Sequence, residues 1–210
     1  MAYQFDETIT DRARFRDIVG REAGSLVNDK TIDHIDLICR RFIAASPFLM
    51  VASQGADGLM DLSPKGDPAG FVHVIDDKTL AIPDRLGNRR HDTFENLLGN
   101  PAIGLFFIIP GIGDTLRVSG TGKIVRDAAL QTRLAINGKE PEFILAVTVE
   151  EAFMHCPKCM KRSRMWTPGE WPDTSDVPTL AQAMVAHGAL SQSVPEMQDI
   201  IENDGKTRLY

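Results

Sequence analysis

The chain has 210 residues and a net charge of −6, from 23 lysine and arginine residues against 29 aspartate and glutamate residues. This acidic balance argues against a general nucleic-acid binder and against a protein that lies on anionic membranes. The composition, 43% hydrophobic and 25% charged, predicts a globular protein with a full core, and the chain lacks an apolar run long enough to cross a bilayer.

Three cysteines, an odd number in a chain of this length, do not indicate a disulfide framework. The first residues carry no signal-peptide pattern. We therefore expect a cytoplasmic protein with reduced thiols.

Helices are expected before the first strand. Apolar residues at helical spacing predict a helix over residues 8–19, and the polar stretch 20–30 predicts a loop. A second helix is predicted to begin with Thr31 as its N-cap and to present a wide apolar face. It should end at Ser46, because the residue before Pro47 is disfavoured in the helical conformation.

After residue 47 the pattern changes to short strands with hairpin spacing. They are predicted over residues 48–53, 59–63, 71–75, 79–83, 102–109, 115–125 and 143–153. Residues 64–70, rich in proline and glycine, are expected to be a loop, and the continuous apolar run 102–109 predicts a strand buried on both faces. Gly120 and Gly122 within a strand predict a bend, a bulge or a close approach.

Six or seven such strands predict a mainly β fold with flanking helices (α+β), in which the strands form a barrel or closed antiparallel sheet rather than a doubly wound parallel one.

One helix interrupts the strands, and a basic turn precedes it. We predict Asn88 as its N-cap, Arg89, Arg90 and His91 in its first turn, and a stop at residues 99–101. Positive side chains at a helix N-terminus oppose the macrodipole unless an anion binds there. Free backbone N–H groups and two guanidinium groups are well suited to a phosphate, so this turn is the predicted phosphate site.

The C-terminal part is predicted to be helical: a basic stretch over 155–166, an irregular linker over 171–178 and two closing helices. We expect a single domain over residues 1–210, with N-terminal helices (1–46), a strand-rich core (47–154) and a C-terminal helical segment (155–210).

Basic residues gather at three places in this acidic chain. The first contains Arg85 with Arg89, Arg90 and His91; the second, residues 155–164, has four lysines and arginines and no carboxylate; the third is Lys65. Each alone is typical of a solvated face, but their joint occurrence predicts a small phosphorylated ligand.

Cys156 and Cys159 have the spacing of half a zinc site and of a thioredoxin-type redox pair. Zinc would need two further ligands, and only His155 is adjacent. A thioredoxin-type pair belongs to a βαβ unit, whereas an antiparallel strand is expected before this motif. We therefore assign no metal and interpret the two cysteines as a helix-start pair in which neighbouring positive charge makes one thiol reactive.

The motifs of serine hydrolases, zinc proteases, P-loop enzymes and dinucleotide-binding folds do not occur in their required context. The five histidines are scattered, so no catalytic residue is assigned. An enzyme whose chemistry is carried by a bound cofactor leaves this kind of sequence.

Five segments carry a resemblance to a known family. They span residues 62–71, 82–90, 100–104, 115–120 and 155–166. In this order they resemble the FMN-binding split-barrel proteins related to pyridoxamine 5′-phosphate oxidase, and more narrowly the branch of FMN-dependent proteins of unassigned substrate. The resemblance implies a six- to seven-stranded antiparallel split barrel and a homodimer that holds FMN at the subunit interface.

The resemblance also implies roles for particular residues. The turn Asn88-Arg89-Arg90 would hold the FMN phosphate, with Arg85 in the same basic segment. Ser63 and Lys65 would contact the phosphate and the isoalloxazine ring. The remaining implied contacts are Arg117 and Ser119 toward the ring, and Ser163, Arg164 and Trp166 from the partner chain.

One departure from the family pattern limits the function. Pyridoxamine phosphate oxidases carry a C-terminal Arg-Leu-x-Asp-Arg segment for the substrate phosphate, and nothing after Trp166 matches it. The resemblance thus implies an FMN-dependent oxidoreductase of unknown substrate, without vitamin B6 oxidation. The alternatives are a non-catalytic flavin carrier or sensor, and a split barrel that binds haem or deazaflavin.

Overall fold

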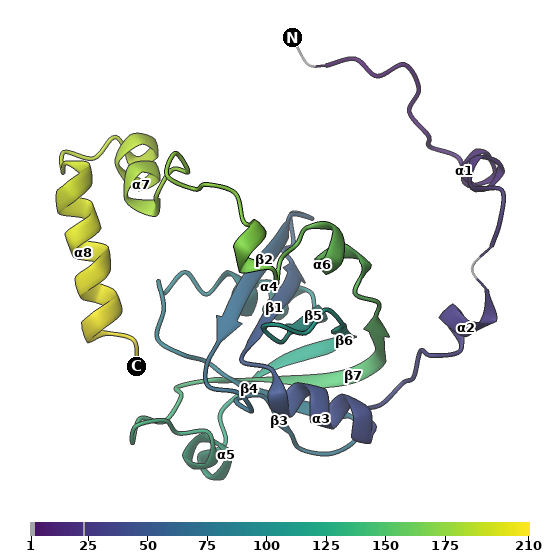
Figure 1. The fold of residues 1–210 in the computed structure, drawn as a ribbon. Helices are drawn as coiled ribbons and strands as arrows, with labels where there is room; N and C mark the ends of the chain where they lie inside the picture. Colours follow the sequence, from purple (N-terminus) through teal and green to yellow (C-terminus); the bar gives the residue numbers. More distant parts are fainter. Residues whose placement is uncertain (1–2, 23) are drawn as a thin grey trace.

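The computed structural model describes residues 3–22 and 24–210; Met1, Ala2 and Ala23 of the predicted N-terminal segment lie outside them. Within the described residues, seven strands form one antiparallel sheet in the order β2-β1-β5-β6-β7-β4-β3, as expected (Figure 1). The strands are β1 (Phe48–Gln54), β2 (Met60–Gly66), β3 (His73–Val74), β4 (Thr79–Pro83), β5 (Ala102–Ile108), β6 (Thr115–Val125) and β7 (Ile144–His155).

Helices precede, interrupt and follow these strands along the chain. They are α1 (Arg12–Val19), α2 (Ser25–Asn28), α3 (Leu37–Ala45), α4 (Asp92–Gly99), α5 (Ala128–Arg133), α6 (Lys158–Arg162), the 3₁₀ turn η1 (Pro168–Glu170), α7 (Leu180–Gly188) and α8 (Val194–Thr207). Each helix of the described ranges is too short or too polar to cross a bilayer.

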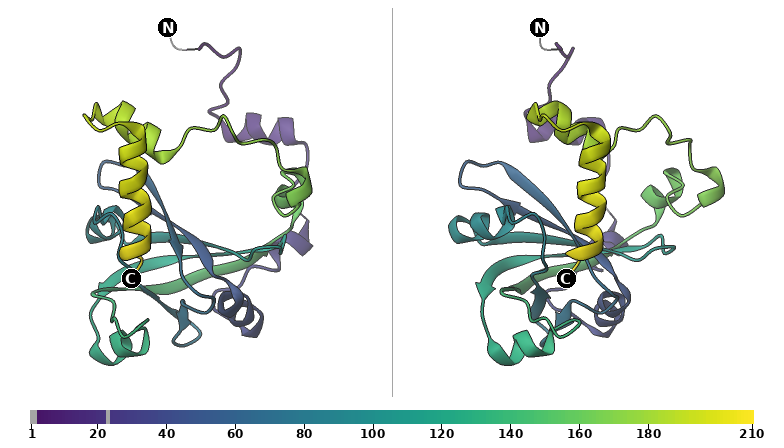
Figure 2. Two further views of the ribbon diagram at one scale, coloured as in Figure 1. Left: turned by 60° about the vertical axis from the view of Figure 1, so that its left-hand side comes forward. Right: turned by 90° about the vertical axis from the view of Figure 1, so that its left-hand side faces the viewer.

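The sheet curls because β6 bends in its middle (Figure 2). The β6–β7 register shifts between Ser119 and Gly120. A Cβ atom at Gly120 would lie 1.9 Å from the carbonyl oxygen of Thr148, so only glycine fits there. Gly122 lets the Leu97 side chain of α4 approach the strand. Both glycines therefore serve the predicted bulge and close approach.

The inner face of the curled sheet holds the core. Leu49, Leu105 and Val118 are fully or almost fully buried there, together with their alternate neighbours along each strand. Helix α3 adds Ile43, and α4 adds Leu97 to the same cluster. These two short amphipathic helices close the core, which fixes α4 and the turn before it against β1 and β2.

Several predicted boundaries were wrong. Asp36, not Thr31, caps α3, because the Ile32 backbone instead forms a two-way bridge with Ala152. Strand β2 continues through Pro64 to Gly66, where a loop was predicted. Proline is tolerated there because β2 is an edge strand and needs fewer backbone donors.

Strand β5 is not buried on both faces. Leu105 and Phe107 face the core, whereas Phe106 and Ile108 on the other face are only partly covered. The predicted strand 71–75 shortens to β3, although Phe71 remains in the core. A continuous apolar run therefore marked two different apolar surfaces, one inside the barrel and one outside it.

The N-terminal segment extends away from the barrel, whereas the C-terminal residue, Tyr210, returns to contact Asp67 (Figures 1 and 2). Helix α1 begins at Arg12, later than predicted, and has no buried residue among those described. A single helical turn, α2, lies within the predicted loop 20–30. Helices α7 and α8, the predicted closing helices, pack against each other rather than on the sheet.

Candidate functional site

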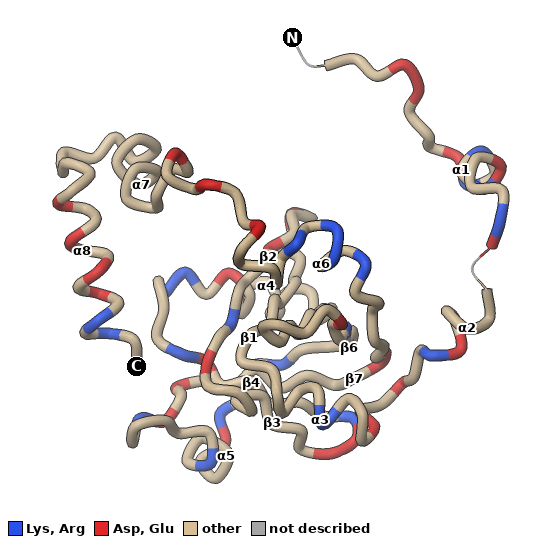
Figure 3. Tube along the Cα trace, in the orientation of Figure 1, with Lys and Arg blue, Asp and Glu red and all other residues tan. Residues whose placement is uncertain are grey.

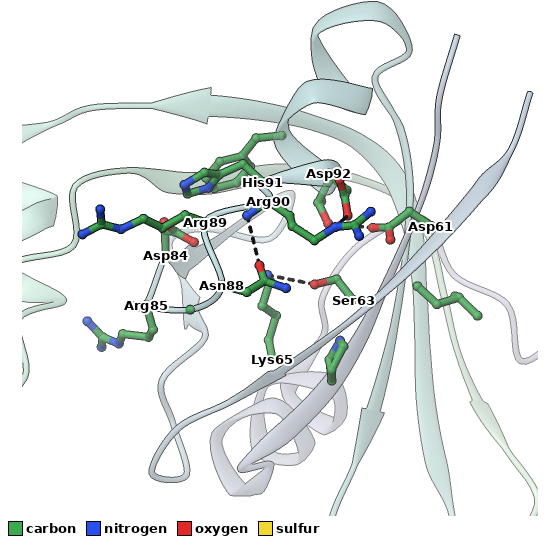
Figure 4. A pocket seen from close by; sticks show the side chains of 15 residues that line it. Asp61, Ser63, Lys65, Asp84, Arg85, Asn88, Arg89, Arg90, His91 and Asp92 are labelled. Carbon is green, nitrogen blue, oxygen red and sulfur yellow. Dashed lines mark hydrogen bonds and ion pairs between the residues drawn. The ribbon is translucent and has the colours of Figure 1, made fainter. Parts of the chain in front are cut away.

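A polar cleft of about 200 Å³ lies between the edge strand β2 and the turn that joins β4 to α4. Figure 4 shows its side chains. The lining combines hydroxyl, amide, ammonium and guanidinium groups with several carboxylates. It includes six of the eleven predicted cofactor residues: Ser63, Lys65, Arg85, Asn88, Arg89 and Arg90.

The turn before α4 has an unusual backbone. Arg89 and His91 adopt left-handed φ angles of 61° and 56°, which few residues other than glycine accept without cost. The Asn88 side chain stabilises the turn, since its Oδ1 accepts the Arg90 backbone N–H at 3.0 Å. The resulting loop presents three consecutive polar side chains toward different parts of the cleft.

The predicted N-cap was wrong. Helix α4 begins at Asp92, with His91 as its N-cap, and its first turn holds Asp92 and Glu95. These carboxylates interact favourably with the positive N-terminal end of the helix dipole. Arg89 and Arg90 therefore belong to the preceding turn, and the expected conflict with the macrodipole does not exist. Their clustering, rather than a helix N-terminus, now supports an anion site.

The basic side chains differ in how they are held. Lys65 Nζ donates to Ser63 Oγ at 3.0 Å, because these two residues, two apart in β2, lie on the same face of the strand. Arg90 Nε donates to Asp92 Oδ2 at 2.8 Å, and this hydrogen bond raises the pKa of the Arg90 guanidinium. In Figure 4 Arg89 points away from Ser63. Lys65, Asn88 and Arg90 thus surround the middle of the cleft with donors.

Carboxylates partly neutralise the positive charge of the cleft. Burial raises the pKa of Asp84 above its ordinary value of 3.8, while the charges of Lys65 and His91 oppose that shift. Asp61 accepts a hydrogen bond from Thr93 Oγ1 at 3.1 Å, which ties β2 to α4. No role was predicted from the sequence for either aspartate. The available signal for Asp84 was its position directly between buried β4 and the basic turn.

Arg85 lines the cleft but directs its guanidinium elsewhere. Its Nε donates to Asp67 Oδ2 at 2.6 Å, and the two side chains are only 18% and 1% exposed. The hydroxyl of Tyr210 donates to the other Asp67 oxygen at 2.7 Å, which raises the pKa of Tyr210. These contacts give Arg85 a structural part: it neutralises a buried carboxylate.

Arg117 and Ser119 lie in a different place, an open groove of about 420 Å³ on the outer face of β2, β1, β5 and β6. They stand opposite Phe106 and Gly104 in the sheet register. The rest of the groove is mainly apolar: Met50, Ala52, Met60, Leu62, Ala102, Ile103 and Leu105 contribute to it. Leu62 lines both the groove and the polar cleft, so the two adjoin across the edge strand.

Ser163, Arg164 and Trp166 follow α6 and do not line the cleft or the groove of their own chain. The Trp166 indole N–H donates to the Ile112 carbonyl at 2.9 Å, and Arg164 pairs with Glu170 at 2.5 Å. This segment is therefore held on the β5–β6 connection. A contribution of these residues to the site of a partner chain stays a prediction.

Comparison with known proteins gives one family and several structures. The family model described as pyridoxamine 5′-phosphate oxidase matches residues 38–156, which hold all of α3 except Leu37, all seven described strands and the cleft. No curated protein sequence matches the chain.

Among solved structures, HupZ of Group A Streptococcus aligns at 22% identity and a TM-score of 0.49, covering 57% of this chain and 93% of that one. General stress protein 26 of Bacillus anthracis aligns at 13% identity and a TM-score of 0.43, covering 54% and 88%. A related protein of Clostridium acetobutylicum, described as of the pyridoxinephosphate oxidase family, reaches 22% identity and 0.40, covering 55% and 83%. These scores are too low to support a statement about ligand or activity.

Proposed function

The chain belongs to the pyridoxamine 5′-phosphate oxidase family of flavin-binding split barrels, and from this membership we propose that it is an FMN-dependent oxidoreductase that works as a homodimer. The observation that carries the proposal is the donor set of the polar cleft. Lys65, Asn88 and Arg90 converge there from an edge strand and a left-handed turn. Charged and amide donors in a partly enclosed site are the groups that bind a phosphate monoester.

The phosphate would be held at the turn. Lys65 Nζ and Ser63 Oγ lie 3.0 Å apart, so one phosphate oxygen can reach both. Arg90 is paired with Asp92, and a phosphate would compete with that carboxylate for the guanidinium. Arg89 would have to turn from the direction seen in Figure 4 to join them. The donor set thus fits a phosphate, with Lys65 already in place and the two arginines adjustable.

The cleft is too small for a whole flavin nucleotide. Its volume of about 200 Å³ lies below the roughly 300–1,000 Å³ of typical small-molecule sites. The apolar groove adjoins it at Leu62 and adds about 420 Å³. An aromatic ring system suits such a lining, which supports the assignment of Arg117 and Ser119 as ring contacts.

A second copy of the chain would cover the groove. Met60 and Leu62 are 62% and 63% exposed on this face, beside the half-covered Phe106. An apolar patch of this kind typically marks an interface. In the proposed dimer the segment after α6 would supply Ser163, Arg164 and Trp166 to the partner's flavin.

When bound, FMN would supply the redox chemistry by accepting or giving a hydride. The residues of this chain would anchor the phosphate, orient the ring and exclude water. Pyridoxamine phosphate oxidation is not proposed, because the C-terminal segment that serves it in that enzyme has no counterpart here.

The test begins with absorption and titration. Purified protein, stripped of bound small molecules, is titrated with FMN and with riboflavin while the quenching of flavin fluorescence is recorded. We expect FMN to bind and riboflavin, which lacks the phosphate, to bind at least a hundredfold more weakly, because two or more charge-assisted hydrogen bonds contribute about 1.5–3 kcal/mol each. Equal affinities would reject the phosphate site, and a failure to bind either would reject the flavin.

Turnover separates the enzyme from a carrier or sensor. FMN-loaded protein is mixed with NADH or NADPH under air, and absorbance of the nicotinamide is followed. Steady oxidation beyond one equivalent supports an oxidoreductase. Retention of FMN without turnover by any electron donor would favour a carrier or sensor, and preferential binding of a deazaflavin would redirect the cofactor.

A further inference from the structure

Two cysteines lie outside the cleft and the groove, at the turn where β7 ends. Cys156 directly follows β7, and Cys159 lies in the first turn of α6. Both side chains are exposed and unpaired by a disulfide. We propose that Cys156 and Cys159 form a redox-active dithiol that reduces anionic low-molecular-weight disulfides and closes into an intramolecular disulfide.

The backbone between the two cysteines supports such a bond. Pro157 has φ −77° and ψ 8°, and α6 begins at the next residue. The Lys161 N–H donates to the Pro157 carbonyl at 2.9 Å, so the chain turns helically here. Residues three apart in a helical turn have Cβ atoms roughly 5–6 Å apart, whereas a disulfide joins Cβ atoms about 3.5–4.5 Å apart. Closing the bond therefore needs the two Cβ atoms to approach by about 1–2 Å, which is an adjustment of the first helical turn.

The turn is held in place by the β5–β6 connection. A Cβ atom on Gly113 would lie 2.7 Å from the Cβ of Pro157, so the proline packs directly on that glycine. Trp166, beyond α6, donates to the carbonyl of Ile112. These contacts fix both ends of the short helix. The two cysteines therefore stay within one helical turn of each other in the reduced protein, which favours closing the ring over keeping a mixed disulfide.

Positive charge surrounds the pair. Lys158, Lys161 and Arg162 are exposed on α6, and the first turn of this helix contains no acidic residue. Figure 3 shows the resulting cluster of blue along α6. In disulfide exchange the attacking species is the thiolate, and these cations lie around its position. The same cations attract anionic disulfides and repel cationic ones.

The third cysteine provides an internal contrast. Cys39 is buried in α3, and burial, with a hydrogen bond to Asp36, raises the pKa of its thiol to about 12. Its thiolate is therefore scarce at neutral pH. Cys39 should remain a thiol while the exposed pair reacts, which gives every measurement an unreactive reference in the same molecule.

The chemical step is two successive exchanges. One cysteine thiolate attacks a sulfur of the disulfide RSSR, so that the RS–SR bond breaks, a protein–SR bond forms and RS⁻ leaves. The second cysteine thiolate attacks the protein sulfur, the second RS⁻ leaves, and the Cys156–Cys159 bond forms. The protein loses two electrons and two protons, and RSSR becomes two RSH.

The experiment uses the full-length protein, reduced and free of flavin, so its result does not depend on the proposed function. Glutathione disulfide, which is anionic, and cystamine, which is cationic, are added in parallel, and intact mass is recorded over time. We expect the wild type to become lighter by two hydrogens with no adduct retained. Cys156→Ser and Cys159→Ser should each keep one glutathione, and Cys39→Ser should behave as the wild type.

The preference for the anionic disulfide is the second readout. Glutathione disulfide should react about tenfold faster than cystamine at low salt, because charge steering changes association rates by that order or more. Lys158→Glu with Lys161→Glu should abolish the preference without removing either thiol. Stable glutathione adducts on the wild type, equal rates for both disulfides, or zinc retained by the two thiols would each overturn the proposal.

Discussion

The polar cleft and the apolar groove lie on opposite sides of the same edge strand and are built by opposite rules. In β2, Ser63 and Lys65 alternate with Met60 and Leu62, so one face of the strand carries donors and the other carries apolar side chains. Binding in the cleft would depend on a few directed charges. Binding in the groove would depend on the apolar area that is buried. A single strand can therefore hold a phosphate on one face and adjoin a ring or a partner chain on the other.

The largest effect on FMN affinity is expected when two positive charges of the cleft are removed. Arg89→Ala with Arg90→Ala should weaken FMN binding by about 3–6 kcal/mol, roughly 10²- to 10⁴-fold, since charge-assisted hydrogen bonds contribute about 1.5–3 kcal/mol each. Fluorescence titration measures the affinity. The matched control is Arg12→Ala with Arg41→Ala, which removes the same charge from exposed positions in α1 and α3. Equal losses in the two variants would mean that only net charge matters.

The next effect concerns the groove. Leu62→Glu places a charge on the apolar face of β2 and should destabilise the proposed dimer by about 2–4 kcal/mol, the range of a central interface residue. Sedimentation velocity over a concentration series measures the dissociation constant. Leu98→Glu, on a residue of α4 that is 80% exposed, is the control. A dimer that survives Leu62→Glu unchanged would place the subunit interface elsewhere.

Salt should separate the two regions without any substitution. Between low and physiological ionic strength, FMN binding should weaken several-fold, because the cleft acts by charge across partly solvated distances. Dimer dissociation should change little, since apolar burial is not screened. Titration and sedimentation in the same buffers test this. If both constants shift together, the cofactor and the interface are not separable.

The smallest effect comes from Asp84. Its raised pKa means that the folded state binds this proton more tightly than the unfolded state, so stability increases as pH falls through the folded pKa and the gain is complete below 3.8. Asp84→Asn should therefore raise Tm at pH 7, and the gain should vanish in acid. It should also tighten FMN binding by at most about 1 kcal/mol. A lower Tm at pH 7 would show that the carboxylate is stabilising.

The sequence predicted the barrel better than its surroundings. Strands β4 and β6 were predicted with their exact limits, because turn residues bound each run of β-formers on both sides. The start of α3 was missed because the Ile32–Ala152 bridge joins residues 120 positions apart, and no local pattern records such a contact. The partly exposed face of β5 was missed for a related reason. In the sequence, an apolar residue that faces the core cannot be distinguished from one that lies on an outer apolar surface.

The candidate site shows the same division. The polar residues of the cleft were found from their clustering, since Ser63, Lys65, Asn88, Arg89 and Arg90 do line one cavity. The partners that restrain them were not found. Asp67 pairs with Arg85, 18 positions away, and with Tyr210, 143 positions away. Only the folded structure brings these residues together, and no local sequence motif records the contacts.

The sequence of strand β2 also affects aggregation through edge-to-edge pairing of strands. An edge strand offers unpaired backbone N–H and C=O groups to any other strand, which is how sheets polymerise. Pro64 removes one of those donors, and Lys65 adds a charge that a stacked copy would have to bury. The edge that meets the proposed cofactor is thus also poorly suited to extending the sheet. Replacing Pro64 by valine should leave the barrel folded and raise its tendency to form fibrous aggregates.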